Sequence, residues 1–184
     1  MKDQTSKGIS DFARPEQYKR IKAWGELAAQ LDRDNPRVKE FNSGLDSWVK
    51  EDMKALNAKI DKVTWRGHAD NAPDNAGKLS KIAVEFLQKE ENKRAERNIE
   101  VGKVLAVVVT GPWRVFKKNL LGEPIQYNLP ILCAVKYESD KDLNVARVYD
   151  STLLTQEYKG VKMAPPFLGA TVGNSYYIRP SALK

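Results

Sequence analysis

The chain has 184 residues, of which 41% are hydrophobic and 30% charged, and this composition excludes a disordered or low-complexity protein. A single cysteine and a single histidine exclude an intrachain disulfide and a histidine-rich metal site. The net charge of +7 favours a nucleic acid, another polyanion such as an anionic lipid, or an acidic protein as the partner.

The first 98 residues are charge-rich and amphipathic, and we expect about three helices there, after a loose arm at residues 1–13. Pro15 is expected to begin the first helix, because its missing N–H costs nothing in a first turn. Asn35 is expected to cap the second helix, with Pro36 at the first helical position. The second helix carries Trp48 on its apolar face, which is either core or a dimer interface. The apolar positions of the first helix, at steps of three and four residues, are Tyr18, Ile21, Trp24, Leu27, Ala28 and Leu31.

The third helix is expected after a loop at residues 64–75, whose glycine, proline, Asn and Asp residues are typical of turns. The tail of this helix, residues 88–97, is nearly all charged, and we interpret it as a solvated helix end. The apolar positions of the helix, which are expected to point inward, are Leu79, Ile82, Ala83, Phe86 and Leu87.

From residue 101 the pattern changes to short β-branched runs separated by proline and glycine. Residues 104–109 form a continuous apolar run, which is typical of a strand buried on both faces. We expect about six strands, with Pro165 and Pro166 able to convert residues 160–172 into a long loop. The later runs are residues 113–118, 125–129, 131–137, 145–149, 152–158 and 171–178.

These patterns predict an α+β protein, with about three N-terminal helices followed by a small, mostly antiparallel β-barrel or curved sheet. We divide it into a helical region at residues 1–98 and a small β domain at residues 99–184. Because residues 98–102 contain no flexible linker, two arrangements stay open. The helices either pack with the β domain as one unit or form a separate arm.

The residues that could carry catalysis have structural explanations. His68 lies in a turn-rich loop, and Cys133 lies in an apolar segment, where a buried thiol is unreactive. Asp70 and Asp74 follow His68 but are interpreted as turn and capping residues rather than metal ligands. No glycine-rich phosphate-binding motif occurs. We therefore expect no catalytic residue, no metal and no cofactor.

One cluster of aromatic and basic residues remains as a candidate binding site. Such residues can stack on bases and hold phosphates, or they can form the centre of a protein interface. The alternative is that Trp113 and a tyrosine fill the core. Nucleic-acid binding requires the four basic residues of the cluster to lie on one surface. The candidates are Trp113, Arg114, Phe116, Lys117, Lys118, Tyr176, Tyr177 and Arg179.

By elimination, we expect a non-enzymatic binding or interaction module that engages a protein partner through the helical face or the β domain. This hypothesis predicts an exposed apolar patch or an open sheet edge. Nucleic-acid or other polyanion binding by the aromatic-basic cluster is the alternative. An enzyme of unrecognised type, using His68 or paired carboxylates, is the second alternative. The helical face could also form a homo-oligomer.

No run of 18 apolar residues occurs, so we expect a soluble protein without a transmembrane segment. The first five residues are polar and lack the apolar segment of a secretory signal. The protein is therefore expected to be cytoplasmic by default, or exported if a leader has been removed.

Overall fold

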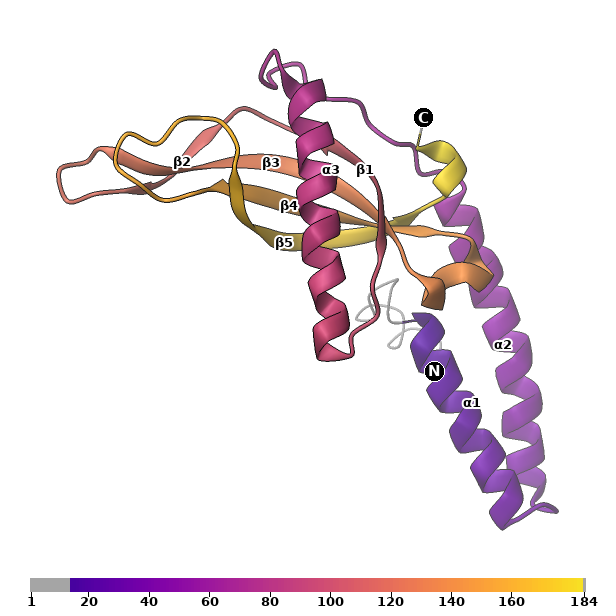
Figure 1. The fold of residues 1–184 in the computed structure, drawn as a ribbon. Coiled ribbons are helices and arrows are strands. Elements are labelled where there is room, and N and C mark those ends of the chain that lie inside the picture. The colour runs from indigo at the N-terminus through magenta and orange to yellow at the C-terminus, as the bar shows by residue number, and fades with distance from the viewer. Residues whose placement is uncertain (1–13, 184) are drawn as a thin grey trace. The chain divides into compact units, whose positions relative to one another are not determined.

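The structure, a computed structural model, describes residues 14–183, so the arm expected at residues 1–13 lies outside the described residues (Figure 1). Three α-helices, α1 (Arg14–Leu31), α2 (Pro36–Ile60) and α3 (Ala76–Asn92), precede an antiparallel five-stranded sheet. The α+β prediction is confirmed. The chain divides into two compact units, residues 1–62 and 63–184.

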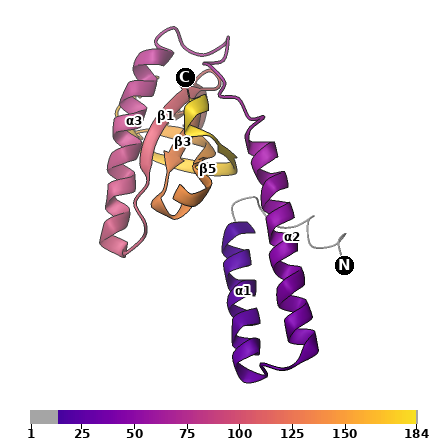
Figure 2. The same cartoon turned by 90° about the vertical axis from the view of Figure 1, so that its right-hand side faces the viewer.

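In the first unit, α1 and α2 form a helical hairpin (Figure 2). The expected cap is present, since Asn35 Oδ1 accepts a hydrogen bond from the N–H of Arg37 at 3.0 Å. Gly25 allows the helices to approach, because a Cβ at this position would lie 2.1 Å from Asn42 Oδ1. The Tyr18 ring packs edge-on against Trp48 at 5.3 Å, so Trp48 contributes to the packing of the hairpin.

The second unit contains the sheet, whose strand order is β1-β3-β4-β5, with β2 pairing on the first part of β3. The sheet is open, with β1 and β2 along one edge and β5 at the other, so the barrel alternative is not found. The strands are β1 (Lys103–Val109), β2 (Arg114–Lys118), β3 (Pro124–Lys136), β4 (Ala146–Thr155) and β5 (Phe167–Ile178).

The strand breaks expected at Pro130 and at residues 150–151 do not occur. The sheet therefore has five strands instead of about six. Pro130 continues β3, where the neighbour of β3 changes from β2 to β1 and a missing N–H is tolerated. Ser151 continues β4 opposite Ile131. Between β3 and β4 lies a 3-10 helix, η2 (Glu138–Leu143). The loop before β5 covers residues 156–166, so residues 167–172 of the loop considered above belong to the strand.

The sheet is covered on both faces. On one face α3 packs, with Leu79 and Ala83 buried against strand residues such as Val107 and Ile131 (Figure 2). On the other face, Val63 and Trp65 pack against a second buried group that includes Val148. Because side chains of β1 contact buried groups on both faces of the sheet, residues of both faces of this strand are apolar.

The change from helical to strand composition near residue 99 coincides with the end of a short 3-10 helix, η1 (Lys93–Arg97), before β1. The compact units nevertheless separate after Lys62. The reason is that α3 buries its apolar face on the sheet and therefore belongs to the second unit. Within residues 14–183, no helix is both long and apolar enough to cross a membrane.

Candidate functional site

The expected aromatic-basic cluster is divided between two ends of the sheet. Arg114 pairs with Asn128, which in turn pairs with Leu154 near the end of β4. Arg179 follows Ile178, which pairs with Ala146 at the start of β4. These two β4 positions are eight residues apart, or about 27 Å along an antiparallel strand. The basic residues of the cluster therefore lie in two groups, with Arg114, Lys117 and Lys118 at one end of the sheet and Arg179 at the other.

Several members of the cluster are also engaged in packing. Trp113 stacks on Phe167 with a centroid distance of 6.4 Å, and Tyr177 is 2% exposed. Tyr176 packs against the core on the face away from α3. Arg179 donates a hydrogen bond to the carbonyl of Leu143. The members that stay exposed all lie on β2, and they are Arg114, Phe116, Lys117 and Lys118.

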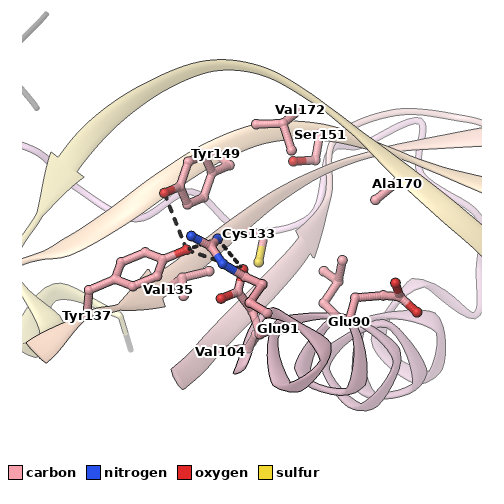
Figure 3. A pocket seen from close by; sticks show the side chains of 12 residues that line it. Glu90, Glu91, Val104, Cys133, Val135, Tyr137, Tyr149, Ser151, Ala170 and Val172 are labelled. Carbon is pink, nitrogen blue, oxygen red and sulfur yellow. Dashed lines mark hydrogen bonds and ion pairs between the residues drawn. The ribbon is translucent and has the colours of Figure 1, made fainter. Parts of the chain in front are cut away.

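A pocket of about 360 Å³ lies between α3 and the sheet (Figure 3). Its apolar wall comes from the strands and from Leu87 of α3. Its polar residues come from the end of α3, from η1, from β4 and from Tyr137, which directly follows β3. The lining residues are Leu87, Glu90, Glu91, Arg94, Val104, Cys133, Val135, Tyr137, Tyr149, Ser151, Ala170 and Val172.

The hydroxyl of Tyr137 is the centre of a hydrogen-bonded cluster at one end of this pocket (Figure 3). It donates to Glu91 Oε1 at 3.2 Å and accepts from Arg94 Nη1 at 3.1 Å. Arg94 Nη1 also bonds Glu91 Oε1 at 3.1 Å. The Tyr149 hydroxyl donates to the Tyr137 hydroxyl at 3.5 Å, and Glu91 Oε2 accepts from the N–H of Gly102 at 3.0 Å.

Two members of this cluster are brought together by their spacing in the sequence. Glu91 and Arg94 are three residues apart, so both point to the same side of the chain as it passes from α3 into η1. Two guanidinium groups lie over the ring of Tyr137, with centroid distances of 5.4 Å to Arg94 and 4.9 Å to Arg147. Both cations are therefore close enough to attract the electron-rich faces of this ring.

The surroundings of the pocket raise the pKa of three of its residues, Tyr137, Arg94 and Cys133. Burial raises the pKa of Tyr137, and the hydrogen bond with Tyr149 and the charge of Glu91 raise it further. Burial alone would lower the pKa of Arg94, but Tyr137 and Glu91 outweigh it and raise this pKa. Burial, with a smaller effect of Glu91, raises the pKa of Cys133 to about 12. At neutral pH the phenol and the thiol are thus protonated, which is unfavourable for a nucleophile or a base.

His68, the first candidate for catalysis, completes the edge of β1. Its Nδ1 accepts a hydrogen bond from the N–H of Val109 at 3.0 Å, and the N–H of Ala69 donates to the Val109 carbonyl. The imidazole also lines a broad hollow of about 810 Å³ with Asp70 and Asp150. Among the described residues, no group of three or more His, Cys, Asp or Glu side chains could hold a metal ion.

The first unit presents a different feature, an apolar stripe on α1. Trp24, Leu27 and Leu31 are 73%, 53% and 80% exposed, and their spacing places them on one face of the helix. Tyr18 and Gly25, which contact α2, lie on another face. α1 is therefore apolar on two sides, and the exposed apolar patch required by the binding hypothesis is present.

The polar end of the pocket was not anticipated from the sequence. Glu91 and Arg94 fall in the charged tail that we interpreted as a solvated helix end, and Tyr137 and Tyr149 were read only as strand residues. The available signal was the spacing of Glu91 and Arg94. This signal is weak, because such pairs are common on exposed helices.

Comparison of the chain with protein-family models, with curated proteins and with solved structures gives no match. The functions considered below are therefore argued from the residues and distances of this chain.

Proposed function

We propose that this chain is a non-enzymatic binding module whose binding site is the pocket between α3 and the sheet. The ligand would be a small, predominantly apolar and uncharged group. The observation that carries this proposal is the pocket itself, in which an apolar wall meets a polar end centred on the Tyr137 hydroxyl. Small-molecule sites typically have this composition, and a volume of about 360 Å³ suits a compact ligand.

The charges of the pocket support an uncharged ligand. The carboxylate of Glu91 and the guanidinium of Arg94 neutralise each other, and Glu90 is paired with Lys93 at 2.6 Å. A charged group entering the pocket would lose hydration and would meet a guanidinium whose charge is already balanced by Glu91. In the part of the chain that the structure describes, the one buried donor of Arg94 without a partner is Nε, which a neutral hydrogen-bond acceptor can also satisfy. A neutral ligand with one hydrogen-bonding atom could use the hydroxyl of Ser151, which also lines the pocket.

The protonation states of the pocket favour binding over catalysis. Burial raises the pKa of the Cys133 thiol and of the Tyr137 phenol, so both are protonated near neutral pH. Catalysis by a thiolate or a phenolate is therefore disfavoured in this pocket.

Binding can be measured with the neutral fluorescent probe N-phenyl-1-naphthylamine and the full chain. Ala170→Phe adds a large side chain at an exposed position of the pocket lining and should weaken probe binding at least tenfold. Thr171→Phe is the matched control, because the next residue of β5 points to the opposite face of the sheet. Equal affinity of both variants, or no binding of the probe to the unmodified chain, would contradict the proposal.

A second candidate function is recognition of a protein partner by the apolar stripe of α1. Large exposed apolar side chains, tryptophan above all, supply much of the affinity at protein interfaces. Residues 17–31 of α1 include three basic residues and one acidic residue, and two of the basic ones, Lys19 and Arg20, are exposed about one helical turn before Trp24. The best-matched partner is therefore an amphipathic helix with acidic flanks.

This second function predicts that a designed acidic amphipathic peptide quenches or shifts the fluorescence of Trp24. Substitution of Lys19 and Arg20 by glutamate should abolish the effect, whereas Lys50→Glu, at an exposed position of α2, should leave it unchanged. Sedimentation equilibrium tests whether a second copy of the chain binds the apolar stripe instead. A dimer dissociated by Trp24→Glu would assign the stripe to a second copy of the chain and overturn the acidic-helix proposal.

A further inference from the structure

The β2–β3 hairpin ends in a turn that is held by one asparagine. Asn119 Oδ1 accepts hydrogen bonds from the N–H groups of Leu121 and Glu123, at 3.0 and 2.9 Å. Its backbone bonds Glu123 and Gly122, and its Nδ2 donates to the Glu123 carboxylate at 2.7 Å. Gly122 has a φ of +82°, which a glycine adopts without strain. The backbone N–H groups of residues 121–123 are thus satisfied within the turn.

This ordered turn presents two leucines to solvent at the end of the hairpin. Leu120 is fully exposed and Leu121 is 84% exposed. Turn tips normally carry polar residues, and no described side chain covers this pair. In Figure 1 the hairpin extends away from α3.

Basic side chains lie directly behind the leucines. Lys117 and Lys118 precede the turn, and the neighbouring loop contributes Lys159 and Lys162. This loop is attached to the hairpin, since the N–H of Tyr158 donates to Ile125 and Lys117 pairs with Glu157 at 2.9 Å. Together, residues 114–123 and 156–166 carry five cationic and two anionic side chains. The hairpin end is therefore apolar at the tip and positively charged around it.

We infer that the β2–β3 hairpin docks on anionic lipid bilayers, with Leu120 and Leu121 inserted into the interface. A strand rises about 3.3 Å per residue, so Lys118 lies roughly 7 Å behind Leu120. This distance places its ammonium among the lipid headgroups when the leucines reach the acyl boundary, about 5–10 Å deep. The N–H groups of Leu121, Gly122 and Glu123 are bonded within the turn, which lowers the cost of placing these three groups in an apolar medium.

The charge pattern favours a lipid surface over a protein pocket. Exposed lysines occur both on the hairpin and in the loop bonded to it, and a surface of negative charge can attract both sets together. This inference is independent of the pocket between α3 and the sheet, because the lining of that pocket includes no residue of the hairpin tip. A failed vesicle experiment would leave the probe-binding experiment unaffected.

The test uses co-sedimentation of the full chain with phosphatidylcholine vesicles, with and without phosphatidylserine. We expect binding only to the anionic vesicles, and binding that weakens as salt is added. Leu120→Asn/Leu121→Asn should weaken it roughly 100-fold. Lys118→Gln should weaken it about fivefold. The matched control, Ile99→Asn/Val101→Asn, replaces two exposed apolar residues that precede β1 and should bind like the unmodified chain.

A second measurement reports insertion directly. Leu121→Cys can be labelled selectively with an environment-sensitive fluorophore, because the native Cys133 is buried. We expect a blue-shifted emission on anionic vesicles and quenching by lipids brominated on their acyl chains. Binding without a blue shift would overturn insertion. Lack of vesicle binding, or a Lys118-dependent affinity for duplex nucleic acid alone, would overturn the lipid assignment.

Discussion

Gly102 is the position where one methyl group should affect both the fold and the pocket. It lies just before β1, and a Cβ there would be 2.3 Å from Val135 Cγ1 and 2.7 Å from Tyr137 Cε1. Both distances are far below ordinary van der Waals contact. Gly102→Ala must therefore displace the start of β1 or push Tyr137 out of its cluster with Glu91.

The size of the effect follows from what is displaced. Overpacking a buried site costs about 1–3 kcal/mol. Movement of β1 would also break the bond from the Gly102 N–H to Glu91, and a bond to a charged group contributes about 1.5–3 kcal/mol. The clash can be relieved either by moving β1 or by moving Tyr137, so the two costs do not add in full. The expected loss of unfolding free energy is therefore about 2–4 kcal/mol. Gly77→Ala is the matched control, because a Cβ in that turn of α3 meets nothing within 4 Å.

The control should stabilise the second unit by about 0.5 kcal/mol, since alanine favours a helix over glycine. Urea unfolding followed by tryptophan fluorescence measures both variants, and Trp65 and Trp113 report on this unit. Probe binding should weaken in Gly102→Ala, because Tyr137 lines the pocket. An unfolding free energy within about 0.5 kcal/mol of the unmodified chain would refute the steric argument.

Three further predictions concern ionisable groups. Arg147→Met leaves Asp140, which it binds at 2.5 Å, buried without this partner, and should lower the unfolding free energy by about 3 kcal/mol in urea titrations. Burial would raise the pKa of Glu100, but hydrogen bonds from Ser139 outweigh it and lower this pKa. The contribution of Glu100 is therefore present above pH 4.5, its ordinary pKa, and lost as the pH falls, so Glu100→Gln should reduce the loss of stability in acid unfolding curves. Cys133 should react with a thiol reagent far more slowly at neutral pH in the folded chain than in urea, and probe in the pocket should slow it further.

Local chemistry made part of the fold predictable. The cap at Asn35 and the turn of helix at Pro36 depend on neighbouring residues alone, and both are found. The apolar run of β1 likewise predicts its burial on both faces. The break expected near Pro130 was wrong, because the tolerance of a strand for proline depends on which strand lies beside it. That pairing is not encoded locally.

The pocket depends on contacts between distant segments, which periodicity cannot give. Tyr137 follows β3, Tyr149 lies in β4, and Glu91 comes from the end of α3. Each has an ordinary explanation in its own element, as a strand aromatic or a helix-surface acid. Only the packing of α3 on the sheet brings the three together.

The aromatic-basic cluster illustrates a different limit of the sequence pattern. The period of two correctly separates the faces of a strand, but it does not tell which end of a sheet a strand occupies. Arg114 and Arg179 therefore looked like neighbours although the register places them at opposite ends. The hairpin tip, by contrast, was visible in the sequence, since Leu120 and Leu121 stand where a turn before Gly122 would normally be polar. The lipid inference follows from this exception, two exposed leucines in a turn that is normally polar. It does not follow from a cluster of residue types that favour binding.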